Sequence, residues 1–211
     1  MKTLTAIVAA LALAGVLPAG AQDVLGVAAS GGLPGQTRDV PVTIRDLAGT
    51  LLDEGDGLNL EIQGFAFRLD FAPSEHITAV TFVQAGVTAG HTPVFPVITP
   101  AANYIIVLMS FDEGTDPLLF TLDAPAPGDL IGALRFTLSA GAPLGTLITL
   151  TFAAVSATLV NGNATLSETL ANGHLALAAG SLLLTHDVFA DGFELGDRCA
   201  WSTSVPPPVC P

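Results

Sequence analysis

The stretch FAFRLDF, Phe65 to Phe71, alternates large apolar side chains with small or charged ones. Successive side chains of an extended strand point to opposite faces, so this stretch has one apolar face and one mixed face. The apolar row consists of Phe65, Phe67, Leu69 and Phe71, and the mixed row of Ala66, Arg68 and Asp70. The pattern predicts a strand with one face in a core.

The same period of two recurs along the chain in LRFTLSA (134–140), ITLTFAAV (148–155) and VPVTI (40–44). Between these runs lie turn clusters rich in Gly, Pro, Asn and Asp, namely SGGLPGQ, LDEGDG, DAPAPGD, SAGAPLG and VNGN. No stretch of a dozen residues carries a helical stripe bounded by caps. Many short strands around one core predict an all-β protein, an antiparallel β-sandwich of about nine strands.

The first residues, Met1 to Ala21, are typical of an export signal: one Lys, a short apolar run and the small-x-small ending Ala19-Gly20-Ala21. We expect cleavage before Gln22; the alternative is a membrane anchor that stays attached. No Cys follows the cleavage point, as a bacterial lipid-anchor signal would require. The expected location is the extracellular space or the cell surface, with the periplasm as the other exported compartment.

Half of the residues are apolar and 12% are charged, which favours one globular domain with a sizeable core. We expect this domain at residues 22–178 and a C-terminal tail at 179–211, with no integral membrane span in the mature chain. Loss of Lys2 with the signal leaves five arginines and nineteen acidic residues, a formal charge of −14. Such a charge disfavours nucleic acid and anionic membrane surfaces as partners.

The order of the strand candidates resembles that of a cohesin domain. The matching segments are VLGVAASGGLPGQTRDVPVTI, IQGFAFRLDFAPSEHITAVTF, NYIIVLMSF, GDLIGALRFTL and TLANGHLAL, which span Val24 to Ala178. The most specific parts are Gly32 and Gly35 before the V-P-V at 40–42, and F-x-F-x-x-D-F followed by Pro73. The resemblance implies a jelly-roll sandwich that binds dockerin modules, with Pro41 on an edge strand that donates no hydrogen bond there.

In cellulosomal cohesins an Asn and an Asp just before the F-x-F segment bind the dockerin, and Ile62 and Gly64 stand at those positions here. The resemblance therefore implies a mostly apolar face for a protein partner, dockerin-like or another surface protein. Its candidate residues are Ile62, Gly64, Ala66, Arg68, Tyr104, Ile106 and Leu108. The alternative is that this row is buried under a loop.

A second function class, carbohydrate binding in polysaccharide catabolism, follows from the superfamily that cohesins share with cellulose-binding modules. The chain has one Trp and one Tyr, too few for the usual row of aromatic rings that stack on sugars. Catalysis has less support, because His76, His91, His174 and His186 lie in no catalytic signature and Ser30-Gly31-Gly32 lacks the ending of a phosphate loop. We expect no enzyme activity and no cofactor.

The loop LLDEGDGLNLE brings together Asp53, Glu54, Asp56 and Glu61. Carboxylates are hard oxygen ligands that calcium prefers, but such a loop is more often a solvated hairpin, and we assign no metal site.

The tail reads HDVFADGFELGDRCAWS from His186 to Ser202. It fails as a calcium loop because Phe189, Leu195 and Arg198 occupy ligand positions. It resembles the D-G-F-E-x-G and W-S ending of many exported Gram-negative bacterial proteins. We expect a disulfide between Cys199 and Cys210.

Two structures for the tail are open, an appended segment and a strand extension over 182–189. With the domain boundary at 178, a chain truncated after Ala179 is expected to fold.

Overall fold

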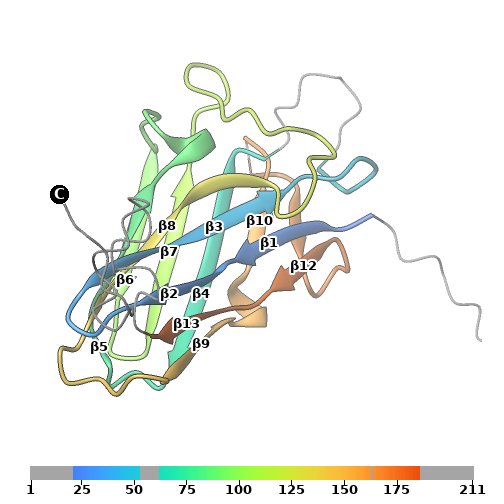
Figure 1. Ribbon diagram of the computed structural model, residues 1–211. Coiled ribbons are helices and arrows are strands. Elements are labelled where there is room, and N and C mark those ends of the chain that lie inside the picture. Colours follow the sequence, from blue (N-terminus) through green and yellow to red (C-terminus); the bar gives the residue numbers. More distant parts are fainter. Residues whose placement is uncertain (1–20, 53–61, 163, 186–211) are drawn as a thin grey trace, which may run out of the picture.

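The computed structural model describes residues 21–52, 62–162 and 164–185, and these form a two-layer β-sandwich (Figure 1). The only helical segments within these ranges are two short 3-10 turns, η1 (Gly86–Thr88) and η2 (Ala154–Ser156). Within the same ranges, no helix has the length and hydropathy of a membrane span. The all-β jelly-roll sandwich expected from the sequence is confirmed.

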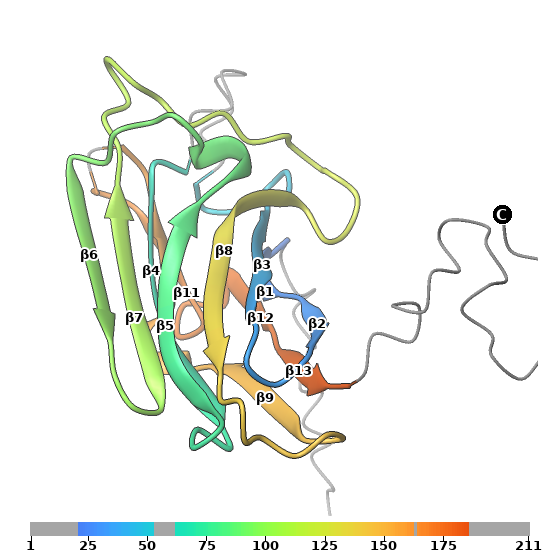
Figure 2. The ribbon, with the colours of Figure 1, turned by 60° about the vertical axis from the view of Figure 1, so that its left-hand side comes forward.

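The two sheets differ in size. The smaller sheet has the strand order β12 (Leu175–Ala178), β1 (Asp23–Val27), β3 (Thr37–Arg45), β8 (Asp129–Leu138) and β5 (Ile77–Gln84). The larger sheet has the order β11 (Ser167–Thr169), β10 (Thr158–Val160), β4 (Gly64–Ala72), β9 (Leu147–Phe152), β13 (Gly180–Leu184) and β2 (Ala29–Gly32). On the other side of β4 it continues through β7 (Tyr104–Ser110) to β6 (Phe95–Pro100). Figure 2 shows β6 and β7 at one side of the molecule and β13 and β2 at the other.

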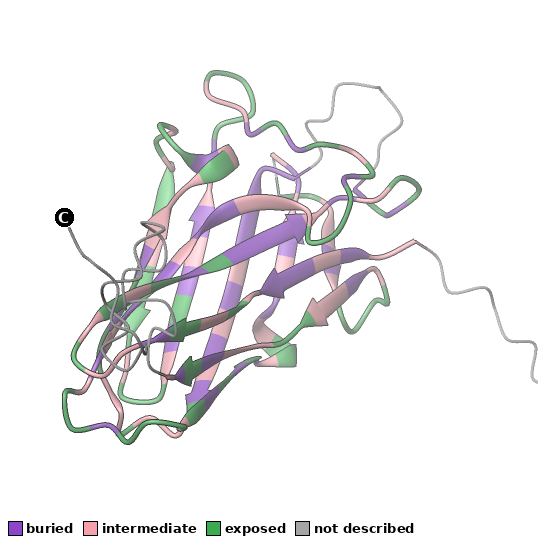
Figure 3. Ribbon diagram, in the orientation of Figure 1, coloured by how far each residue is buried: buried purple, intermediate pink, exposed green. Residues whose placement is uncertain are grey.

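The apolar row of FAFRLDF lies between the sheets on β4, and its four side chains are at most 2% exposed. Phe67 meets Phe152 of the same sheet edge to face, with ring centroids 5.5 Å apart. Phe71 meets Phe136 of the smaller sheet at 5.6 Å, and Phe65 meets Phe82 at 6.2 Å. Figure 3 shows buried and less buried residues alternating along β4. The Phe row therefore joins the two layers.

Both ends of the described chain cross from one sheet to the other. The first segment leaves the smaller sheet after β1 and enters the larger sheet as β2, while β12 and β13 make the same change beside it. The pairs β1 with β12 and β2 with β13 are parallel. The sequence predicted an antiparallel sandwich, and these two pairs depart from it, because the two segments that cross between the sheets lie beside each other and run in the same direction.

The crossing also affects the number of strands. The described residues form thirteen strands where the sequence suggested about nine, and each of the two crossing segments, β1 with β2 and β12 with β13, accounts for one of the additional strands. Gly180 lies at one crossing, where an added Cβ would lie within 2.2 Å of the Ala28 carbonyl oxygen. A side chain at position 180 would therefore push the two crossing segments apart.

The predicted domain boundary at residue 178 is wrong. β13 pairs with β9 on one side and β2 on the other, so it is an interior strand of the larger sheet. Leu182 and Leu184 are fully buried in the shared core. The strand alternative for the tail is correct for 182–184, and the remainder of that proposed extension lies outside the described residues. Cys199 and Cys210, with their expected disulfide, also lie outside them.

Pro41 does not lie on an edge strand, because β3 is the middle strand of the smaller sheet. The ladder between β1 and β3 ends at the pair Val27 and Val42, next to Pro41. The Pro41 carbonyl accepts a hydrogen bond from the Ala28 amide at 2.9 Å, so the proline nitrogen also faces Ala28, where β1 has ended and the chain leaves the smaller sheet. The missing donor of proline therefore falls at the end of this ladder, where at most one reciprocal bond is lost.

We predict that a chain ending at Ala179 does not fold, in contrast to the expectation from sequence. It lacks Leu182 and Leu184, and losing a fully buried leucine typically costs about 2–5 kcal/mol against a total domain stability of about 5–15 kcal/mol. Urea unfolding followed by circular dichroism tests this, with a chain ending at Thr185 as the control that keeps β13. A cooperative transition in the shorter chain, with an unchanged midpoint, would show that β13 is dispensable.

Candidate functional site

The outward face of β4 and β7 carries most of the predicted partner-binding residues. In the register of this antiparallel pair, Ala66 lies opposite Leu108 and Arg68 lies opposite Ile106. All four side chains are half-buried or exposed, and Ile106 is 36% exposed. These residues share a face because they alternate with the buried Phe row on β4 and its counterpart on β7.

Arg68 is held in one orientation by two neighbours on this face. Its Nε and Nη2 atoms donate hydrogen bonds to Asp70 Oδ1 at 2.9 and 2.6 Å. Its guanidinium carbon lies 4.0 Å from the centroid of the Tyr104 ring, a cation–π contact. Arg68 and Asp70 remain 38% and 40% exposed, so the cluster combines fixed geometry with access from solvent.

Two of the predicted residues do not belong to this exposed face, and their assignment to it is corrected. Ile62 is 1% exposed and is part of the core, and Gly64 is also buried. An added Cβ on Gly64 would come within 2.7 Å of the Val160 side chain on neighbouring β10. The alternative of burial is therefore correct for these two positions and incorrect for Ala66, Arg68 and Ile106.

The face extends beyond the predicted residues onto β6. Phe95 and Val97 lie opposite Ser110 and Leu108 of β7, and Phe95 is 57% exposed. Sequence reasoning did not select Phe95 because Pro96 and Pro100 obscure a strand pattern. The signal that could have identified Phe95 is that its segment lies next to the clearly alternating strand β7 in the sequence and can form a hairpin with it. Asp70 was likewise part of the mixed row but was not assigned to the site.

The free edge of β6 is poorly suited to pairing with another strand. Ala101 donates to the Tyr104 carbonyl at 2.8 Å, which makes this the hydrogen-bonded pair next to the turn. Because hydrogen-bonded and non-hydrogen-bonded pairs alternate along an antiparallel ladder, the backbone N–H and C=O positions of Pro96, Ile98 and Pro100 face away from β7, toward the free edge. Two of these three positions carry no N–H, so the edge offers few donors to an added strand. Side chains on the face, rather than backbone at the edge, are what this region presents.

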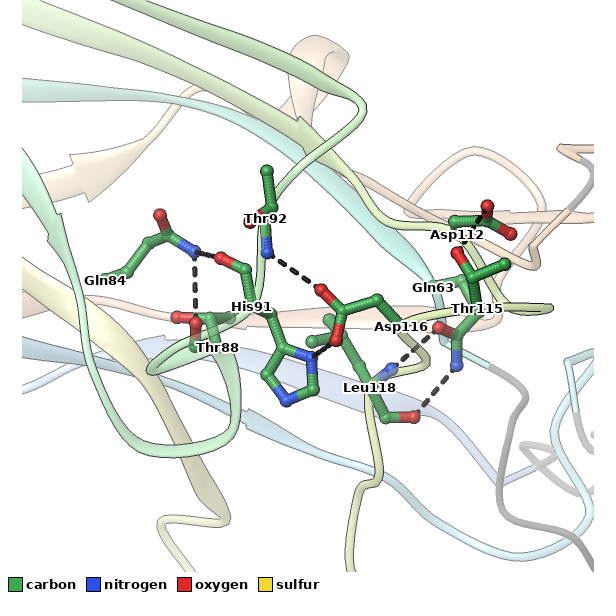
Figure 4. A network of polar contacts seen from close by, with 9 residues as sticks. All are labelled: Gln63, Gln84, Thr88, His91, Thr92, Asp112, Thr115, Asp116 and Leu118. Atoms are coloured by element: carbon green, nitrogen blue, oxygen red, sulfur yellow. Dashed lines mark hydrogen bonds and ion pairs between the residues drawn. The ribbon is translucent and has the colours of Figure 1, made fainter.

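A second polar cluster lies at one end of the sandwich (Figure 4). His91 Nδ1 is 2.7 Å from Asp116 Oδ1, and the Thr92 amide donates to Asp116 Oδ2 at 2.9 Å. The hydrogen bond donated by the Thr92 backbone amide, together with the His91 contact, holds the pKa of Asp116 below its usual range. Nearby, the Gln63 side chain exchanges two hydrogen bonds with the backbone of Leu118, at 2.9 and 2.8 Å.

This cluster ties loops together and forms no catalytic triad. In the described parts of the chain, the His91 ring is hydrogen-bonded to Asp116 and to no hydroxyl or thiol. A nucleophile next to the imidazole is what acyl transfer requires. His76 Nε2 lies 3.9 Å from Glu75 Oε1. His174 precedes β12, and His186 lies outside the described residues.

A metal site finds no support in the described ranges, where no group of three or more His, Cys, Asp or Glu side chains is placed to hold an ion. The acidic loop residues Asp53, Glu54, Asp56 and Glu61 lie outside the described residues, as do all of the tail residues from His186 onward.

Comparison with known proteins identifies the fold. No family model matches the chain, and no curated protein matches it significantly. Among solved structures, a chain from the complex of the third ScaC cohesin with a ScaB dockerin of Acetivibrio cellulolyticus is similar. Its TM-score is 0.56 at 12% identity, over 78% of this chain and 99% of that one.

A type I cohesin–dockerin complex from Clostridium thermocellum gives a TM-score of 0.56 at 11% identity, over 77% of this chain and 99% of the matched chain. A non-cellulosomal cohesin of the archaeon Archaeoglobus fulgidus gives 0.52 at 12% identity, over 81% and 96%. The chain therefore has a cohesin-like fold, and the resemblance seen in the sequence is confirmed at the level of fold.

We predict that Ala66→Glu changes stability by only about 0.5 kcal/mol, because its side chain lies on the outward face where substitutions are usually tolerated. Phe67→Ala, one residue away, removes a ring that is 1% exposed and should cost about 3–5 kcal/mol. Urea midpoints of the two variants against the unmodified protein measure both effects. A large drop for Ala66→Glu would mean that this face is covered in the folded protein.

Proposed function

We propose that this protein is an exported, non-catalytic binding module that holds a protein partner on the outward face of β4, β7 and β6. The observation that carries the proposal is the rigid set of half-exposed residues Ala66, Arg68, Tyr104, Ile106 and Leu108 on adjacent strands of one sheet. A face built on strands is presented in a fixed shape and loses little conformational entropy on binding.

The cohesin-like fold supports a protein partner. Two of the similar structures are described as complexes of cohesins with dockerins, and that property belongs to those proteins. In this chain Ile62 and Gly64 replace the polar anchors of the resemblance and are buried, so the contact chemistry differs from theirs. We expect the partner to bind at the position that a dockerin occupies on a cohesin, but to make its contacts with different chemical groups.

The composition of the face indicates what the partner presents. Ile106, Leu108 and Phe95 supply apolar area, and Arg68 with Asp70 supplies one fixed polar pair. Interfaces of this kind bury an apolar centre with aromatic and Arg side chains at its strongest contacts. The matching partner surface is apolar, with a hydrogen-bonding group placed against Arg68.

Polysaccharide binding is the less favoured function. Tyr104 is the only tyrosine in the chain, and Arg68 covers one side of its ring at 4.0 Å. A pyranose stacks on an open aromatic face, and several such faces in a row are usual in sugar-binding sandwiches. The geometry around Tyr104 instead favours recognition of a protein.

We predict that Ala66→Glu abolishes capture of the partner, because the new charge would be buried without a counter-ion in the interface. The immobilised protein is incubated with exported proteins of the producing organism, and bound proteins are quantified by mass spectrometry. The matched control is Ala133→Glu, which places the same charge on the half-buried outward position of β8 in the smaller sheet.

A specific protein lost at least tenfold in Ala66→Glu and retained in Ala133→Glu is the expected result. Equal loss in both variants, or retention of the unmodified protein on insoluble polysaccharide with no protein captured, would contradict the proposal.

A further inference from the structure

Three acidic side chains are buried close to the start of β1. Asp23 and Glu168 are fully buried, and Asp46 is 2% exposed. Asp23 is the first residue of β1 in the smaller sheet, and Glu168 is the middle residue of β11 in the larger sheet. Carboxyl groups are rarely buried without partners, so this arrangement requires an explanation.

Two of these carboxyl groups, those of Asp23 and Glu168, each use one oxygen to hold the loop that follows β3. Asp23 Oδ1 accepts a hydrogen bond from the Leu47 amide at 2.8 Å. Glu168 Oε1 accepts the amides of Leu51 and Leu52, at 2.8 and 3.1 Å. The loop is therefore fixed to both sheets through two side chains that come from opposite ends of the described chain.

The second oxygens of this pair, Asp23 Oδ2 and Glu168 Oε2, are buried, and no N–H or hydroxyl group of the described residues donates to them. Glu168 raises the pKa of Asp23 through its charge and through side-chain hydrogen bonding, so the two carboxyl groups lie within hydrogen-bonding reach of each other. An ionised carboxylate only accepts hydrogen bonds, so a bond between two carboxyl groups requires a proton on one of them.

The surrounding groups favour that proton. Asp46 adds negative charge near Asp23, and burial followed by the neighbouring Glu168 raises the pKa of Asp23 to about 9. On the β12 side, the His174 carbonyl accepts the Asp23 amide at 3.0 Å. Asp123 lies beyond the loop and accepts the Ala48 amide at 3.1 Å.

Two arginines form ion pairs with other carboxylates, Arg68 with Asp70 and Arg135 with Asp39. Arg45, the residue before Asp46, donates from Nε to the Ala124 carbonyl at 2.8 Å. A proton on Asp23 would offset the buried negative charge as a cationic side chain does in an ion pair.

We propose that Asp23 and Glu168 share one proton at neutral pH, and that this pair clamps the 46–52 loop to both sheets in a pH-dependent manner. In the unfolded chain Asp23 loses its proton near its ordinary pKa of 3.8, whereas in the folded protein it keeps the proton to about pH 9. The clamp contributes its full stability below about pH 4 and loses it progressively as the pH rises to about 9.

The test compares the full chain with Asp23→Asn by thermal unfolding at pH 5 and pH 8. Asn keeps an oxygen for the Leu47 amide and donates permanently to Glu168, so it replaces the shared proton. We expect the variant to melt at least about 5 °C higher than the unmodified protein at pH 8, with a smaller gain at pH 5. The matched control is Asp39→Asn at the exposed Arg135 pair, where the pKa of Asp39 is lowered by the Arg135 hydrogen bonds and the substitution should bring no gain at pH 8.

Infrared spectroscopy provides a readout that does not depend on a variant that folds. The unmodified protein at pH 7 should show the carbonyl band of a protonated carboxyl group, and this band should weaken as the pH passes about 9. A midpoint of Asp23→Asn that is equal to or lower than that of the unmodified protein at pH 8 would overturn the proposal. Absence of the infrared band, with a midpoint raised by Ca²⁺ and lowered by a chelator, would overturn it in favour of a bound cation.

Discussion

The row of Phe65, Phe67 and Phe71 between the two sheets is the constraint on which the rest of the structure depends. It fixes which face of β4 points inward, and a shift of one residue would move every side chain of the strand to the other face. Because Phe67 and Phe71 meet Phe152 and Phe136 edge to face, the register of β4 is set by ring contacts as well as by hydrogen bonds. The outward positions, and with them the proposed binding face, follow from this burial.

The second feature that holds the sandwich together is its closure by the two ends of the described chain. β1 and β2 run beside β12 and β13, and both segments cross between the sheets near Ala28 and Gly180. Asp23 of the smaller sheet and Glu168 of the larger sheet add a polar link, because both accept hydrogen bonds from the same loop after β3. The fold thus depends on contacts between residues that are more than a hundred positions apart in the sequence.

Sequence reasoning located the alternating strands well and the closure poorly, for a physical reason. The inward row of FAFRLDF is visible because burial imposes a period of two, whereas GSLLL after Ala179 carries no alternation that distinguishes an interior strand from a tail. Similarly, Ile62 continues the parity of Ala66 and Arg68, and only the fold places it in the core. The central residues Ala66, Arg68 and Ile106, and Asp70 beside them, could be assigned to one face from periodicity. Phe95 required the pairing of β6 with β7, and the contact of Asp70 with Arg68 required the folded structure.

A cohesin-like fold here carries a face that lacks the polar anchors of the resemblance, and we propose that the partner makes contact on that face. A photo-reactive amino acid placed at position 66, and in a separate protein at position 133, tests this claim directly in the presence of the exported proteins of the producing organism. We expect a discrete cross-linked species from position 66 and none from position 133. A cross-linked species that forms from position 133, or equally from both positions, would contradict it.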